Sequence, residues 1–287
     1  MLFGRLFHGT DQQRTDAQDA PIGVFDSGVG GLTVVREIMR QIPNEKIIYF
    51  GDTARVPYGS KSQDTVIRFS EQIVRFLRTF DVKTIVVACN TASAYALDTL
   101  EQDIDIPIIG VVKPGAKAAT EVTRNGKIGV IATEATINSN IYTKYITELN
   151  RNCTIYGKAC SLFAPLVEEG LWKDPVPPEN DRRYLAELID IDIDTLILGC
   201  THYPLIRTAL GRIMGSQVSL VNPAYETAIE LKQMLAEMDM LNDEAPGLGR
   251  NQYQFYVSDK AEKFVRFANS IIKYGILSAK AVNIEEY

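Results

Sequence analysis

The chain has 287 residues, of which 46% are hydrophobic and 23% are charged, and its formal net charge is −6. This length allows one large domain or two of ordinary size, and no apolar run approaches the roughly 18 residues of a membrane span. Phosphates demand a basic surface, so the acidic balance and the lack of a basic stripe argue against nucleic acid as a partner. The first twenty residues are polar and do not resemble a secretory signal, so we expect a cytoplasmic protein that does not bind membranes.

Short apolar runs alternate with amphipathic segments in the first part of the chain. Strands are predicted at 22–25, at 46–50, just before Cys89 and at 106–112. Apolar residues with a period near 3.6 predict helices after Gly31 and from Asp64, and one further along the chain around 137–149. This alternation is typical of a parallel sheet covered by helices, with the polar loops that follow the strands forming the binding crevice.

The segment around Cys200 repeats the segment around Cys89. Residues 84–93 read TIVVACNTAS and residues 195–204 read TLILGCTHYP, so each is an apolar run ending in a cysteine. The opening strand is repeated as well, because Ile22-Gly23-Val24 aligns with Ile128-Gly129-Val130. The chain therefore contains two similar units with a cysteine at equivalent places.

We predict an α/β fold with two similar Rossmann-like domains, parallel sheets and an active site in the interdomain cleft. Residues 1–20 are a polar N-terminal extension, residues 21–113 with 223–287 form the first domain, and residues 114–222 form the second. The C-terminal segment holds a predicted strand and helices but no cysteine unit. We therefore assign it to the first domain.

The four cysteines show no framework spacing, so free thiols are expected in a reducing cytoplasm. Free cysteine is often a small buried residue, and Cys153 and Cys160 are interpreted in that way. Cys89 and Cys200 differ because each ends a strand and precedes hydroxyl or amide side chains that suit a bound carboxylate. We predict that both are functional.

Thiolate formation needs a base or a stabilising charge, and His202 follows Cys200 closely while Asp26 ends the first strand. The simpler interpretations are that His202 is a structural histidine and that Asp26 only caps a helix. Two thiols that meet across a cleft could take a proton from one face of a carbon and deliver one to the other, as racemisation requires. Redox, zinc and acyl-transfer chemistry explain the symmetry less well, since none needs two distant, equivalent cysteines.

Two cofactor-dependent readings fit the sequence less well. Residues 22–52 outline a dinucleotide-binding unit, but Thr33 stands where the third glycine of the fingerprint belongs, and Asp26 would face the pyrophosphate. A pyridoxal enzyme needs a Schiff-base lysine, and nothing around Lys113 favours that role. We therefore expect neither a cofactor nor a metal.

Six motifs in order resemble those of the glutamate racemases, in the cofactor-independent aspartate/glutamate racemase superfamily. They are GVFDSGVGG (23–31), GDTARVPYG (51–59), ACNTAS (88–93), ATEAT (132–136), PLVEEG (165–170) and GCTHYP (199–204). The resemblance runs from about residue 22 to residue 259. Residues 161–164 depart modestly from the family pattern, and residues 1–20 have no counterpart in shorter relatives.

The resemblance implies that the protein interconverts L- and D-glutamate and supplies D-glutamate for peptidoglycan. It implies that Cys89 deprotonates the D-isomer and Cys200 the L-isomer, with Asp26 and His202 assisting. Members of the family are often dimers, so a homodimer is expected. Some longer relatives are activated by a cell-wall precursor, and the sequence leaves open whether this chain is. The implied substrate contacts are Asp26, Ser27, Tyr58, Gly59, Asn90, Thr91, Thr133, Glu168, Thr201 and His202.

Two other functions are left open by the residues themselves. The same cysteine pair would serve a racemase for aspartate or another amino acid. A fold that only binds a carboxylate or nucleotide and regulates a partner would also present polar loops at the strand ends.

Overall fold

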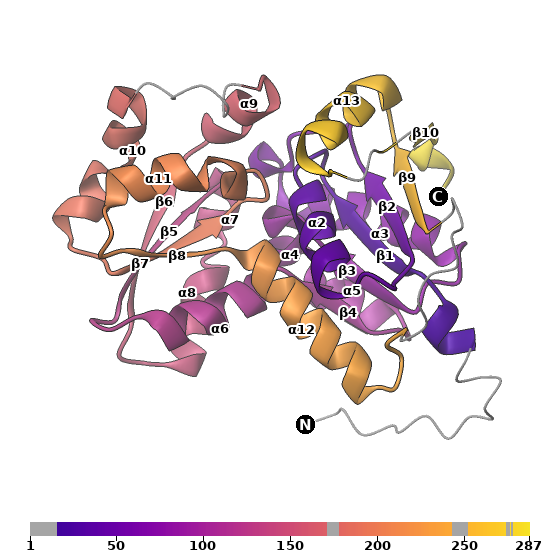
Figure 1. Ribbon diagram of the computed structural model, residues 1–287, viewed down its shortest axis with the longest axis horizontal. Coiled ribbons are helices and arrows are strands. Elements are labelled where there is room, and N and C mark those ends of the chain that lie inside the picture. The colour runs from indigo at the N-terminus through magenta and orange to yellow at the C-terminus, as the bar shows by residue number, and fades with distance from the viewer. Residues whose placement is uncertain (1–15, 171–177, 243–251, 274–275, 277) are drawn as a thin grey trace.

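Two parallel sheets form the framework of the computed structural model (Figure 1), which describes residues 16–170, 178–242, 252–273, 276 and 278–287. The first sheet has the strand order β10-β9-β2-β1-β3-β4, and the second has the order β6-β5-β7-β8. The strands of the first sheet are β1 (Ile22–Asp26), β2 (Ile47–Gly51), β3 (Thr84–Val87), β4 (Ile108–Gly110), β9 (Tyr253–Val257) and β10 (Lys280–Ala281). Those of the second are β5 (Lys127–Ala132), β6 (Thr154–Ala159), β7 (Thr195–Gly199) and β8 (Ser219–Val221).

The predicted repetition of the two units is confirmed by the order of the strands. In the first sheet β1 lies between β2 and β3, and in the second β5 lies between β6 and β7, with all of these pairs parallel. Cys89 follows β3, and Cys200 follows the equivalent strand β7. The C-terminal strand β9 pairs with β2, as expected for a segment that returns to the first unit.

Helices cover both faces of each sheet, so the central strands β1, β3 and β7 are buried along their whole length. On the first sheet, α2 (Leu32–Gln41), α12 (Pro223–Glu237) and α13 (Ala261–Ile271) pack on one face, and α3 (Gln63–Arg78), α4 (Asn90–Tyr95) and α5 (Leu97–Asp103) on the other. On the second, α9 (Phe163–Glu168), α10 (Pro178–Asp190) and α11 (Arg207–Met214) face α6 (Val112–Val122) and α8 (Ile141–Leu149). The remaining helix α7 (Glu134–Asn138) follows β5, and short 3₁₀ turns lie at Tyr58–Ser60, Tyr203–Ile206 and Ile284–Glu286.

Several elements differ from the sequence-based expectation. The strand predicted at 106–112 is shorter, because α6 begins at Val112 and accommodates Pro114 in its first turn, where no backbone donor is needed. The single helix expected around 137–149 is divided at Asn140, whose φ of 54° cannot continue a right-handed helix. The edge strands β8 and β10 were not predicted.

The predicted polar extension is described only from residue 16, and its first fifteen residues lie outside the described part. Residues 16–19 are helical, and Asp19 pairs with Lys46 at 2.6 Å. The limits predicted for the two domains stay a prediction. In the part of the chain that the structure describes, no helix has the length and apolar character needed to cross a bilayer.

Candidate active site

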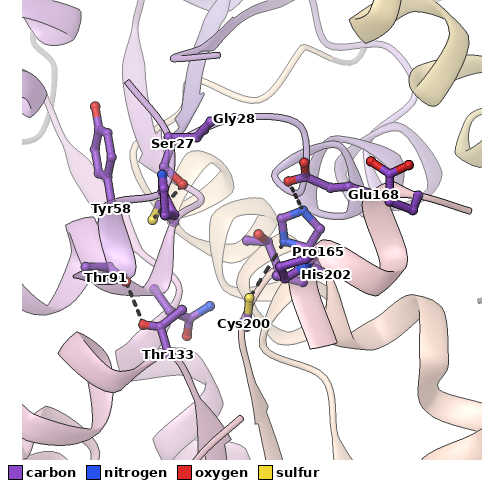
Figure 2. Close-up of a pocket in the computed structure, with 17 residues that line it drawn as sticks. Ser27, Gly28, Tyr58, Thr91, Thr133, Pro165, Glu168, Cys200 and His202 are labelled. Carbon is purple, nitrogen blue, oxygen red and sulfur yellow. Dashed lines mark hydrogen bonds and ion pairs between the residues drawn. The ribbon is translucent and has the colours of Figure 1, made fainter. Parts of the chain in front are cut away.

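The loops that follow β1, β2, β3, β5 and β7 meet at one cavity, as the parallel topology predicts. Every residue predicted for the site except Asp26 lines this cavity. Figure 2 shows Ser27, Tyr58 and Thr91 on one side, and Cys200, His202 and Glu168 across from them. The sequence repeat thus places its two cysteine segments around a single site.

Cys89 is held at the start of α4, on the side of the first sheet. Its Sγ accepts a hydrogen bond from the backbone N–H of Ala92 at 3.5 Å, and it donates to Ser27 Oγ at 3.6 Å. Burial, reinforced by the negative charge of Asp26, raises the pKa of Cys89 to about 12. This side chain therefore holds its proton and is a thiol.

Asp26 ends β1 and is 1% exposed, but it is not among the residues that line the cavity. Its Oδ2 accepts from the backbone N–H of Gly28 at 3.0 Å, and among the described residues its buried Oδ1 has no hydrogen-bond partner. Burial raises the pKa of the carboxyl, and the charge of His202 opposes that shift. The predicted assistance to Cys89 stays a prediction, and so does the contact with substrate.

Cys200, His202 and Glu168 form a relay on the side of the second sheet (Figure 2). His202 Nδ1 lies 3.7 Å from Cys200 Sγ, and its Nε2 lies 3.1 Å from Glu168 Oε1. Burial alone would lower the pKa of His202, but its hydrogen bonds to Cys200 and Glu168 raise that pKa to about 10. The two hydrogen bonds therefore favour the charged imidazolium form of His202.

The Tyr58 hydroxyl is held in place by a hydrogen-bonded network around Asp52. Its hydroxyl donates to Asp52, which also accepts from Arg55 Nε and from Ser258 Oγ, each at 2.8 Å. Arg55 in turn reaches Glu285, near the C-terminus, at 3.0 Å. Burial raises the pKa of the Tyr58 phenol well above its ordinary range, so Tyr58 stays a hydrogen-bond donor.

Threonine side chains join the two sheets at the edge of the cavity. Thr91 Oγ1 lies 2.9 Å from Thr133 Oγ1 and 3.2 Å from Thr136 Oγ1. Thr33 on α2 donates to the backbone oxygen of Thr201 at 2.8 Å. The loop at Gly59 also lies close to Thr133. Only glycine fits at this position, because an added Cβ would lie only 2.6 Å from Thr133 Cβ.

The sequence analysis did not predict the residues that lie outside the cavity lining and form hydrogen bonds to residues that line it. Tyr142 donates to Asn90 Oδ1 at 2.7 Å, and the sequence analysis placed none of Tyr142, Thr33 and Thr136 at the site. These side chains sit on helices whose apolar period gives no sign of a polar contact with a distant segment. Only their proximity in the folded chain identifies them.

A model of the Asp/Glu/Hydantoin racemase family matches residues 22–229. The chain belongs to this family. A glutamate racemase of Geobacter metallireducens is 47% identical over 251 residues, covering 88% of this chain and 92% of that protein. The racemase family thus accounts for both cysteine segments and for most of the chain.

Two solved structures of glutamate racemases show the same fold. The enzyme of Francisella tularensis, in complex with D-glutamate, is 39% identical with a TM-score of 0.86, covering 94% of this chain and 100% of that one. The Escherichia coli enzyme, in complex with L-glutamate and the activator UDP-MurNAc-Ala, is 28% identical with a TM-score of 0.75, covering 92% and 98%. The racemase fold therefore extends over nearly all of this chain.

Proposed function

We propose that the chain interconverts L- and D-glutamate by proton transfer at Cα between two thiols. The observation that carries this proposal is the placement of Cys89 and Cys200 after equivalent strands, β3 and β7, at one shared cavity. Similarity to glutamate racemases over most of the chain supports glutamate as the substrate. The D-glutamate formed would serve peptidoglycan synthesis.

The reaction uses one thiolate and one thiol in each direction. With L-glutamate, the Cys200 thiolate takes the α-proton, so the Cα–H bond breaks and an S–H bond forms. The Cys89 thiol then gives its proton to the opposite face of Cα and is left as a thiolate. With D-glutamate the same two steps run in reverse, and the total number of protons on the pair does not change.

The neighbouring groups have matching roles in this scheme. His202 donates to the Cys200 sulfur, and its imidazolium charge favours the thiolate that L-glutamate needs. Asp26 is proposed to assist Cys89. The hydroxyl and amide side chains around the cavity are proposed to bind the two carboxylates and the amino group: Ser27, Tyr58, Asn90, Thr91, Thr133 and Thr201, with the backbone of Gly59 and with Glu168.

The proposal is tested by isotope incorporation. Purified protein incubated with L-glutamate in deuterated water is expected to form D-glutamate that carries deuterium at Cα. A panel of other amino acids, aspartate included, is the comparison. Preference for aspartate would replace glutamate as the assigned substrate, and tight glutamate binding without exchange of the α-proton would contradict racemase activity altogether.

Single-thiol variants test the assignment of direction. Cys89→Ala keeps the base for the L-isomer but cannot protonate the other face, so L-glutamate should gain deuterium and keep its configuration. Cys200→Ala should do the same with D-glutamate only. Full racemisation by either variant would contradict the two-thiol mechanism.

A homodimer and activation by a cell-wall precursor are also proposed. The first proposal is tested by the mass of the purified protein in solution, and a monomer at assay concentration would contradict it. The second is tested by assays with and without UDP-MurNAc-Ala, the activator in the Escherichia coli complex. Equal rates in both assays would contradict it.

A further inference from the structure

Tyr142 and Asn90 form a buried hydrogen bond between the two halves of the site. Tyr142 lies on α8, beside the second sheet, and Asn90 begins α4, beside the first. The phenol donates to Asn90 Oδ1 at 2.7 Å, and the two residues are 3% and 4% exposed. The bond therefore links the segment after Cys89 to a helix of the opposite unit.

The Tyr142 hydroxyl keeps its proton and is a hydrogen-bond donor to Asn90. Burial, together with the negative charge of the nearby Cys200, raises the pKa of its phenol, so the hydroxyl keeps its proton. The ring fits closely against the strand that leads to Cys200, since a Cβ added to Gly199 would lie 3.3 Å from Tyr142 Cε2. The protonated phenol is able to donate, and in the structure it donates to Asn90 Oδ1.

This hydrogen bond holds the Asn90 amide in one orientation, with Oδ1 toward Tyr142. With Oδ1 accepting from Tyr142, the Nδ2 end is the one available to the cavity that Asn90 lines. An N–H donor suits a substrate carboxylate. The reversed amide would present an oxygen to that carboxylate and repel it.

We propose that Tyr142 is a positioning residue for substrate binding, which holds the Asn90 amide with its N–H₂ group toward a carboxylate of the substrate. This inference rests on the proposed function. Tyr142 has no direct part in the proton transfer. Its loss is therefore expected to weaken binding of both enantiomers without removing the chemistry.

The test is a double-mutant cycle of Tyr142→Phe and Asn90→Ala, measured as kcat and KM for both enantiomers. Tyr142→Phe removes only the donor, and we expect KM to rise about five-fold, the worth of one hydrogen bond, with kcat changed by less than about two-fold. In the Asn90→Ala background the same substitution should change KM by less than about two-fold. A five-fold effect in both backgrounds, or in neither, would overturn the proposal.

Tyr145→Phe is the matched control, because it makes the same chemical change one turn away on α8, where Tyr145 lies near Lys113 and Lys144 outside the cavity. It should leave KM unchanged.

Asn90→Asp keeps an acceptor for Tyr142 but offers no donor, so its KM should exceed that of Asn90→Ala. This comparison can be made even if Tyr142→Phe fails to fold. An inactive wild-type protein would contradict the proposed function itself, whereas an active wild type with an unchanged Tyr142→Phe contradicts only this inference.

Discussion

His202 Nδ1 lies 3.7 Å from Cys200 Sγ, so the imidazole and the thiol form one hydrogen-bonded unit within the cavity. Glu168 contacts the far nitrogen of the ring at 3.1 Å and is partly exposed. The pKa of Glu168 is lowered by its hydrogen bond to His202, although burial by itself raises it. The Glu168 carboxylate and the Cys200 sulfur therefore both favour the charged form of the histidine.

Glu168→Gln should shift the pH dependence of racemisation to lower pH. The pKa of His202 is raised to about 10, so His202 loses its proton, and with it the support for the Cys200 thiolate, as pH rises through that value. Removing the Glu168 charge lowers this pKa, so the alkaline limb of kcat/KM moves down in pH. At neutral pH we expect a loss of about ten-fold in kcat/KM, on the order of the cost of replacing a charge-assisted hydrogen bond by a neutral one.

The profile is measured from pH 6 to 11 with either enantiomer. Glu187→Gln, on α10 and paired with Lys158, makes the same change of charge outside the cavity and should leave the profile in place. An alkaline limb that stays near pH 10 in Glu168→Gln would show that Glu168 does not hold the proton on His202.

Gly30→Ala should nearly abolish activity. An added Cβ would lie 2.2 Å from Thr201 Oγ1 and 2.6 Å from the His202 ring, so both side chains would have to move. A displacement of about 1 Å at a catalytic group costs on the order of 100-fold in rate, and we expect a loss of at least that size in kcat/KM. Gly211→Ala on α11 is the control, because its Cβ would meet only Leu220 Cδ1 at an ordinary 3.5 Å. Equal activity of the two variants would contradict the close fit.

The sequence was sufficient for the parts of the site that follow strands. Cys89 and Cys200 could be placed because a buried parallel strand is a continuous apolar run and its end is marked by the first polar residue. The sequences of the two cysteine segments match, so the prediction of a strand in one supports the prediction of a strand in the other. The polar residues that follow them, Asn90 and Thr201, could therefore be assigned to the cavity.

The contacts behind the site could not be predicted, because they depend on how the two units meet. Tyr142 reaches Asn90 across 52 positions, and Thr33 reaches Thr201 across 168. No periodicity encodes such distances. Asp26 ends β1, as the sequence predicts, but its side chain is buried and does not line the cavity, so its roles stay predictions.

Lys83→Met should destabilise the fold without changing the chemistry. Lys83 Nζ lies 2.6 Å from Glu45 Oε2, and the side chains are 1% and 0% exposed. Lys83 also donates to the backbone oxygens of Gln18 and Met240. Loss of the cation leaves a buried carboxylate without its ion pair, at a cost of about 3–5 kcal/mol.

Thermal unfolding is the measurement, with an expected decrease in Tm on the order of 10 °C. Adding Glu45→Gln to Lys83→Met removes the buried charge and should restore part of the loss. If the double variant is less stable than Lys83→Met alone, the cost does not come from the unpaired carboxylate.

His202→Gln should lower kcat/KM by the same factor in both directions, although Cys200 is the thiol that His202 contacts. Enantiomers have equal free energies in water, so the ratio of the two kcat/KM values equals the equilibrium constant of one for any variant and at any pH. The different surroundings of the thiols, with His202 beside Cys200 and Asp26 near Cys89, can therefore appear only in kcat and KM separately, as changes that cancel in the ratio. Full progress curves from each pure enantiomer, followed by optical rotation, give both values. A ratio that departs from one in His202→Gln would show that a reaction other than simple two-thiol racemisation consumes one of the enantiomers.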